Sequence, residues 1–398
     1  MRVLHLVNYG WPYIDGYTAR SRSIVNAQRR ELGVDAVVAV SPYPAFAQAK
    51  DPDLVADGWG PGQVQVPGTG PRRGERPALG LAPRSGSAFV RGVVEVIDAI
   101  APDLVHAHHP AFVGRAGLAA ARRRGLPFVY EVRCFNGDYD LDARHPYLRA
   151  RGHRQNRLEL ALCRAADRVV TISDGLADRI VDGGVLKNKV DVVRNAVDTE
   201  LWTPRPRAEH PGTLRIGYAT TFEAIEGLDL LVAAVEQVAP VLATRGVSLE
   251  VVLAGTGRDW SRIQQLVAKA GLEGVIQLPG FLTREAMHQF YADLDLFVVP
   301  RRPAAVSTDT TPLKPLEALA NGRPLLTTDL PALRELLNGQ DAARFVPATA
   351  TGLASGILAF ADEPWHPQTP VDLGERSWAS EVHRYRGIYD QLRTATHG

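Results

Sequence analysis

Short apolar runs separated by longer amphipathic stretches occupy most of the first half of the chain. The apolar runs predict buried β-strands at residues 3–7, 36–40, 104–107, 128–132 and 168–172. Between them, the spacing of apolar residues predicts helices at 17–32 and 88–100. Continuous apolar runs are typical of parallel strands that are covered on both faces. The alternation of strand and helix therefore predicts a doubly wound α/β sheet.

The same alternation begins again in the second half of the chain. Apolar runs predict strands at 214–218, 249–254, 275–278, 296–299 and 324–327. Helices are expected at 260–270 and at 228–239, where Pro240 should end the helix. The sequence thus predicts a second α/β domain.

The boundaries follow from breaks in this pattern. A proline-containing stretch, 197–212, predicts a linker, which gives an N-terminal domain at 1–195 and a C-terminal domain at 196–377. The amphipathic end of the chain, 378–398, is expected to pack back on the first domain. A Gly-, Pro- and Arg-rich segment at 57–86 predicts a long loop. Two open α/β domains in series are expected to face a central cleft at the carboxyl ends of their strands.

Composition narrows the class of partner. The chain has 398 residues and a net charge of +1, which does not favour nucleic acid as a partner. Two cysteines, Cys134 and Cys163, predict reduced thiols and a cytoplasmic protein. The sequence shows no uninterrupted apolar run near 18 residues, so no membrane span is expected. Arginines at 144–164 predict a solvated helix face and leave open a peripheral membrane contact.

The segment 300–337 carries the clearest chemical signal. An apolar strand ends at Pro300, a polar loop follows, and a helix is expected to start near Pro312 or Pro315. Backbone N–H groups at the start of a helix attract anions, and Lys314 lies there. Glu317, one turn later, can accept hydrogen bonds from a diol. This pattern suits a diphosphate next to a ribose.

This segment also resembles a known family. Residues 312–336, PLKPLEALANGRPLLTTDLPALREL, look like the donor-binding signature of retaining GT-B glycosyltransferases of family 4. Five shorter segments earlier in the sequence also resemble the family and occur in the family's order: DLVHAHH at 103–109, ADRVVTIS at 166–173, VRNAVD at 193–198, AGTG at 254–257 and LPGF at 278–281. Two more, GYTARSR at 16–22 and YEVR at 130–133, look closer to the subset associated with exopolysaccharide and exosortase systems. The resemblance implies the GT-B fold, with two Rossmann-like domains.

The resemblance assigns donor-side roles in the C-terminal domain. Glu317 would bind the ribose hydroxyls, and Asp309, eight positions earlier, would reach the transferred sugar. The family places an Arg and a Lys where this chain has Thr221 and Glu226, so the diphosphate charge must be neutralised elsewhere. The expected residues of the donor site are Arg301, Arg302, Pro312, Leu313 and Lys314, with Gly255 in a turn and Phe281 near the base.

In the N-terminal domain the resemblance points to the start of the first helix and to two strand ends. His108 is expected to contact the transferred sugar or the acceptor, and Gly16 to bring backbone close to the diphosphate or the acceptor. Tyr17, Glu131 and Arg133 are acceptor-side candidates. A zinc site in the HAHH run is not expected, because no matching Cys or carboxylate pair is spaced for it.

Together with these residues, the resemblance implies a retaining, metal-independent glycosyltransferase that uses a UDP- or GDP-sugar and no cofactor. The acceptor would be a small molecule, a lipid-linked molecule or a glycan. In this mechanism Lys314 and arginines stabilise the leaving diphosphate, and by resemblance a phosphate oxygen takes the acceptor's proton. Trp260 stands where a dinucleotide fingerprint needs its third glycine, which argues against a nicotinamide enzyme. A sugar-nucleotide epimerase of the same fold and a non-catalytic sugar-nucleotide-binding subunit remain alternatives.

Overall fold

The computed structural model describes residues 1–9, 16–41, 63–66, 86–366 and 373–397. The chain divides into two compact units, one formed by Met1–Asn195 with Trp378–Gly398 and the other by Ala196–Ser377. Each unit has its own hydrophobic core. The first unit is thus built from both ends of the chain, and the second is inserted between them.

The first unit contains a seven-stranded parallel sheet in the order β3-β2-β1-β4-β5-β6-β7. This order, in which the chain reverses direction across the sheet between β1 and β4, is that of a doubly wound fold. The central strands are buried along nearly their whole length, as their continuous apolar runs predict. The strands are β1 (Arg2–Val7), β2 (Asp35–Val40), β3 (Gln63–Gln65), β4 (Leu104–His108), β5 (Phe128–Val132), β6 (Arg168–Thr171) and β7 (Val190–Val192).

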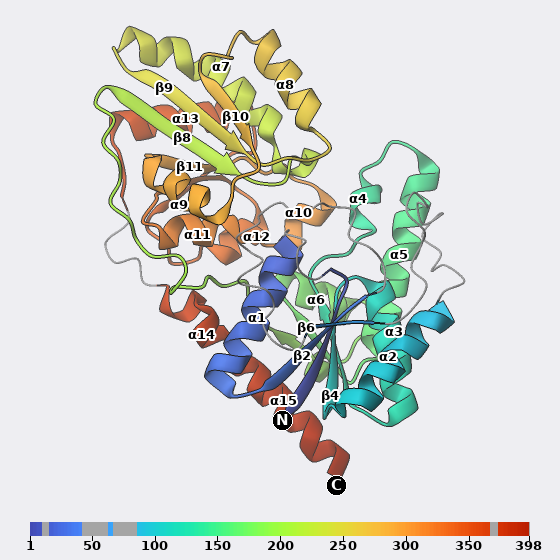
Figure 1. Ribbon diagram of the computed structural model, residues 1–398. Helices are drawn as coiled ribbons and strands as arrows, with labels where there is room; N and C mark the ends of the chain where they lie inside the picture. Colours follow the sequence, from blue (N-terminus) through green and yellow to red (C-terminus); the bar gives the residue numbers. More distant parts are fainter. Residues whose placement is uncertain (10–15, 42–62, 67–85, 367–372, 398) are drawn as a thin grey trace. The chain divides into compact units, whose positions relative to one another are not determined.

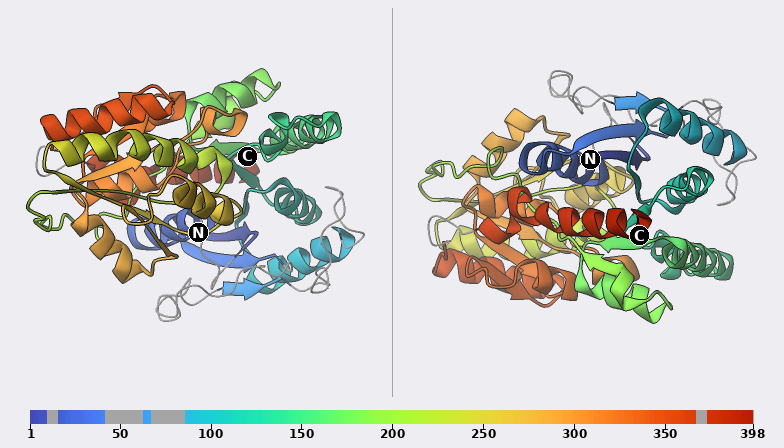
Figure 2. Two further views of the ribbon diagram at one scale, coloured as in Figure 1. Left: turned by 90° about the horizontal axis from the view of Figure 1, so that it is seen from above. Right: turned by 90° about the horizontal axis from the view of Figure 1, so that it is seen from below.

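Helices cover both faces of this sheet. On one face α1 contacts the two C-terminal helices, and on the other α2 packs against α3 (Figure 1). Figure 2 shows α15 running alongside α1, and Tyr385 and Tyr389 of α15 are fully buried there. The helices are α1 (Gly16–Leu32), α2 (Gly86–Ile100), α3 (Ala111–Arg124), α4 (Asp138–Leu141), α5 (Pro146–Ala165), α6 (Asp174–Asp182), η3 (Lys187–Lys189), α14 (Trp378–Glu381) and α15 (His383–His397).

The second unit repeats the plan with a six-stranded parallel sheet in the order β10-β9-β8-β11-β12-β13. Its strands are β8 (Thr213–Ala219), β9 (Ser248–Ala254), β10 (Ile276–Gly280), β11 (Leu296–Val299), β12 (Leu325–Thr328) and β13 (Ala343–Val346). Its helices are η4 (Ala224–Glu226), α7 (Leu228–Thr244), α8 (Trp260–Lys269), α9 (Arg284–Asp293), α10 (Ala305–Asp309), α11 (Lys314–Ala320), α12 (Pro331–Leu336), α13 (Ala350–Asp362) and η5 (Gly374–Arg376).

Three local expectations were wrong. Helix α7 continues through Pro240 to Thr244, because the buried side chains of Val238 and Leu242 fasten the last turn to the core. The segment 57–86, expected to be a loop, contains the short strand β3 and the start of α2; most of its remainder lies outside the described residues. The polar loop after β11 contains the short helix α10.

One helical stretch, Ala224–Thr244, is long and apolar enough by composition to cross a membrane. Its apolar residues form part of a protein core, since Leu231, Val235 and Val238 are fully buried in the core of the second unit. We therefore interpret α7 as a core helix.

Candidate functional site

The segment after β11 carries most of the residues predicted to bind a donor. Arg301 follows the strand directly, and its side chain is buried. The Thr328 hydroxyl of β12 donates to the Arg301 carbonyl oxygen over 2.7 Å, which fastens the start of the segment to the sheet. Helix α11 begins at Lys314 with Pro315 in its first turn, as the sequence predicts.

Glu317 is held at this place by two donors. The Lys314 ammonium lies 2.9 Å from Glu317 Oε2, and the Tyr291 hydroxyl donates to the same oxygen over 3.1 Å. Burial and the neighbouring Glu317 carboxylate raise the pKa of Tyr291 well above its usual value, so the phenol remains a donor. Glu317 is 12% exposed and Lys314 35%, so both side chains reach the surface. A carboxylate and a cation of this kind can bind a diol and a phosphate.

Arg301 faces a second carboxylate. Its guanidinium donates to the Thr310 carbonyl oxygen over 2.9 Å and lies 3.4 Å from Glu226 Oε1. The other oxygen of Glu226 accepts a hydrogen bond from the Tyr218 hydroxyl. Glu226 stands where the resemblance expects a lysine, so at this place a carboxylate replaces a cation and Arg301 is the positive charge beside it. Thr221, at the position of the family's arginine, is exposed.

The two carboxylates belong to one neighbourhood. Tyr218, the partner of Glu226, and Tyr291, the partner of Glu317, both pack on the ring of Phe297, with centroids 5.5 and 5.7 Å away. The predicted residues Arg301, Lys314 and Glu317 are thus arranged around one aromatic cluster at the end of β8 and β11.

Several other residues were also predicted to bind the donor. Arg302 pairs with Asp229 over 2.6 Å, and Arg262 contacts the same carboxylate. Although burial alone would raise the pKa of Asp229, the hydrogen bonds from these two arginines lower it. Asp309 is the last residue of α10 and is half-buried. The remaining candidates, all half-buried, are Pro312, Leu313 and Phe281.

Gly255 has a structural role that the sequence did not reveal. Its φ is +128°, and a Cβ there would come within 1.8 Å of the Thr220 carbonyl oxygen. The backbone at Gly255 therefore approaches the protein's own chain closely, and its predicted contact with the donor stays a prediction. Gly16, by contrast, is exposed at the start of α1, where a Cβ would meet nothing within 4 Å.

In the first unit, Glu131 lies at the centre of a buried polar network. Its carboxylate accepts hydrogen bonds from Arg20 Nε at 3.0 Å, Arg133 Nε at 2.8 Å and the Tyr385 hydroxyl at 2.6 Å. Burial opposes the charge, but the Arg20 and Arg133 guanidinium groups hold the pKa of Glu131 well below its usual value. Arg20 also donates to the carbonyl oxygens of Val193 and Arg194, at the end of the first unit's N-terminal segment.

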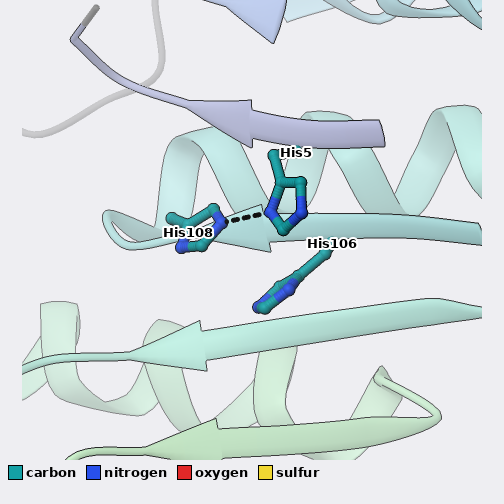
Figure 3. A group of neighbouring side chains, drawn as sticks. All are labelled: His5, His106 and His108. Carbon is teal, nitrogen blue, oxygen red and sulfur yellow. Dashed lines mark hydrogen bonds between the residues drawn. The ribbon is translucent and has the colours of Figure 1, made fainter. Parts of the chain in front are cut away.

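Arg133 fixes the protonation of a chain of histidines. Its guanidinium, which can only donate, lies 2.7 Å from His108 Nδ1, so this nitrogen must accept. His108 Nε2–H then donates to His5 Nδ1 over 2.9 Å (Figure 3), and His5 Nε2–H donates to Gln28 Oε1 over 3.0 Å. Each ring in this chain is therefore neutral, with its hydrogen on Nε2.

The chain of hydrogen bonds continues to a third histidine. Gln28 Nε2 donates to the Tyr389 hydroxyl over 3.0 Å, and that hydroxyl donates to His106 Nδ1 over 2.7 Å. His106 Nε2 lies 3.6 Å from Glu131 Oε2, which is longer than a hydrogen bond but places the ring beside that carboxylate. Burial lowers the pKa of all three histidines, that of His5 to about 3, in agreement with neutral rings.

These three histidines could be considered as metal ligands, since nitrogen atoms of His5, His106 and His108 lie within 4.8 Å of one another. However, the His5 and His108 nitrogens that face each other already share a hydrogen (Figure 3). The rings of His106 and His108 are stacked at 4.3 Å, and two guanidinium groups lie nearby. This environment suits a neutral hydrogen-bond chain better than a cation.

The structure places three of the predicted site residues of the first unit inside this network, and their direct contact with a substrate stays a prediction. Glu131 is 0% exposed, His108 1% and Arg133 3%, and all three are bonded to one another. Tyr17 is partly exposed and borders this network: Arg133 donates to its carbonyl oxygen, and its ring stacks on His109.

Sequence reasoning missed several members of the network. Arg20, Gln28 and His5 are polar residues on faces that the pattern assigns to the interior, and this mismatch was the available signal. His109 was not among the predicted site residues; it lies 3.8 Å from Cys134 Sγ and 3.5 Å from Glu159 Oε1. Burial alone would lower the pKa of His109, but these two neighbours raise it to about 10.

The sequence matches two family models. One, described as Glycosyltransferase Family 4, matches residues 45–201, and the other, Glycosyl transferases group 1, matches residues 213–363. A D-inositol 3-phosphate glycosyltransferase of Nocardiopsis dassonvillei is 28% identical over 71% of this chain and 62% of its own length. A GDP-mannose-dependent alpha-mannosyltransferase of Mycobacterium tuberculosis is 27% identical over 62% of this chain and 60% of its own length. The chain thus spans about three fifths of these curated relatives.

Among solved structures, HepE of Anabaena in complex with UDP superposes with a TM-score of 0.65. The two sequences are 17% identical, and the match covers 99% of this chain and 98% of HepE. This likeness, together with the two parallel sheets, confirms the predicted GT-B fold. Since the two family matches together take in well over half of the sequence, the chain belongs to glycosyltransferase family 4.

Proposed function

We propose that the protein transfers a sugar from a UDP- or GDP-sugar to a hydroxyl acceptor, with retention of configuration and without a metal ion. The observation that carries this proposal is the aromatic cluster of the second unit, which gathers Glu317, Lys314 and Arg301 at one place. HepE binds UDP and the mycobacterial relative depends on GDP-mannose, which supports both nucleotides as candidates.

Under this proposal each side chain meets one part of the donor. Glu317 accepts hydrogen bonds from the ribose hydroxyls, and Lys314 and Arg301 bind the diphosphate. Breaking the sugar–phosphate bond adds negative charge to the diphosphate, and fixed cations stabilise that charge most in the transition state. Asp309 is the proposed contact to the transferred sugar, and a phosphate oxygen takes the proton of the acceptor hydroxyl.

The acceptor is proposed to be a small molecule, a lipid-linked molecule or a glycan, used in polysaccharide or glycolipid assembly or in natural-product glycosylation. An epimerase of the same fold would use the same donor site but would convert the sugar nucleotide without any acceptor. Incubation with a UDP- or GDP-sugar alone separates the two, because an epimerase would then release an altered sugar.

The direct test is a thermal-shift screen with UDP, GDP, their sugars, NAD and ATP, with and without EDTA. We expect stabilisation by UDP or GDP compounds, none by NAD or ATP, and no effect of EDTA. Glu317→Ala should abolish the shift. The matched control is Asp293→Ala, since Asp293 contacts Gln289 and Arg215 at the opposite end of β11. Equal loss in both variants would contradict the proposed site.

A further inference from the structure

Each cation of the proposed donor site faces a carboxylate of the same unit. Lys314 pairs with Glu317 at 2.9 Å, and Arg301 faces Glu226 at 3.4 Å. These four groups carry no net charge together. A diphosphate that binds here must therefore compete with carboxylates for both cations.

The two carboxylates differ in the hydrogen-bond partners that a bound donor would give them. When Lys314 turns to a phosphate, Glu317 can accept hydrogen bonds from the ribose. Glu226 gains no such partner from the donor, and one of its oxygens already accepts from the Tyr218 hydroxyl. Its negative charge therefore remains beside the bound diphosphate.

The backbone of Glu226 is held near Arg301, because its turn is fastened to the chain around that residue. The Arg302 N–H donates to the Ile225 carbonyl oxygen over 2.9 Å. Gly227, with φ +66°, lies so close to the Pro300 carbonyl oxygen that a Cβ would come within 2.0 Å. The contact between the Arg301 guanidinium and Glu226 is looser, since 3.4 Å is longer than a charge-assisted hydrogen bond.

We propose that Glu226 competes with the donor's diphosphate for Arg301 and so promotes release of the nucleoside diphosphate product. This inference rests on the proposed function. A sugar-linked diphosphate carries two negative charges, whereas the free diphosphate gains most of a third, since a terminal phosphate ionises near pH 6. Repulsion from Glu226 consequently weakens product binding more than donor binding.

The test compares Glu226→Gln with the wild type by calorimetric titration of UDP, GDP and their sugars at pH 7.5. The glutamine can still accept a hydrogen bond from Tyr218 but carries no charge. We expect the Kd of the free nucleoside diphosphate to fall about fivefold or more, and that of the sugar-linked donor to fall less. Glu223→Gln is the matched control, because this carboxylate faces Arg258 at 3.7 Å, and it should leave both constants unchanged.

A second background shows whether Glu226 acts through Arg301. In Arg301→Gln, the additional change Glu226→Gln should improve binding less than it does in the wild type, because only direct repulsion from the diphosphate is then removed. If Glu226→Gln does not fold, Glu226→Asp withdraws the charge and should shift the constants in the same direction by less. Unchanged or weaker product binding, or equal gains in the Arg301→Gln background, would overturn the inference and leave the proposed function intact. If neither nucleotide binds the wild type, the proposed function fails and this inference fails with it.

Discussion

The polar networks of the two units are built from the same residue types but differ in how far they are buried. In the first unit, Glu131 is fully buried and accepts hydrogen bonds from two arginines and a tyrosine. In the second, Glu317 is 12% exposed and is held by Lys314, itself 35% exposed, and a tyrosine. A fully buried network whose members bond one another fixes them in place, whereas a partly open one can exchange partners with a ligand. The comparison therefore supports a positioning role for the network of the first unit and the proposed binding role for that of the second.

The largest difference should appear when each carboxylate loses its charge. Glu131→Gln leaves Arg20 and Arg133 buried without a counter-charge, and we expect the first unit to lose about 3–5 kcal/mol of stability. Glu317→Gln leaves only a partly exposed lysine, so the stability of the second unit should change by less than about 1 kcal/mol.

Urea titration followed by hydrogen exchange in peptides from β5 and β11 measures the two units separately. Glu31→Ala, which removes a partly exposed carboxylate paired with Arg30 in the first unit, is the control and should have little effect. Equal stability losses in Glu131→Gln and Glu317→Gln would contradict the assignment.

The histidine chain of the first unit predicts a pH dependence of intermediate size. Because the pKa of His5 falls from its ordinary 6.5 to about 3 on folding, the unfolded chain takes up a proton first as the pH decreases. The contribution of the neutral His5 ring to the free energy of unfolding is complete above pH 6.5 and is lost progressively between pH 6.5 and 3. Between pH 6 and 5, where carboxylates still titrate little, the slope should approach about 1.4 kcal/mol per pH unit for this histidine.

The same urea and exchange measurement, repeated at several pH values, checks this slope. His5→Gln should reduce it, although the substitution also lowers stability at every pH. His153→Ala, which removes an exposed histidine of α5, should leave the slope unchanged. In ¹⁵N spectra, His108 Nδ1 should remain unprotonated from pH 5 to 8. Protonation of His108 in that range would contradict the neutral chain.

The same contrast in burial explains how far the sequence could predict the molecule. Apolar periodicity and the start of α11 depend on neighbours along the chain, so the α/β fold class and the place of Lys314 and Glu317 were predictable. The roles of His108, Glu131 and Arg133 depend on Arg20, Gln28, Tyr385 and Tyr389, which lie far away in sequence. Likewise, Gly255 could be identified as special, but only the structure identifies Thr220 as the group it approaches. Pairing across such distances leaves no local pattern.

The smallest expected effect on stability, and the most selective effect on binding, comes from Lys314. Lys314→Met keeps the length of the side chain and removes its charge, so stability should change by less than about 0.5 kcal/mol. The Kd of the nucleoside diphosphate should rise about tenfold, as expected for one charge-assisted contact to phosphate. Lys269→Met, on the exposed surface of α8, is the matched control and should alter neither quantity. A loss of stability without a loss of affinity would make the Lys314–Glu317 pair a structural ion pair, and the second unit would then resemble the first.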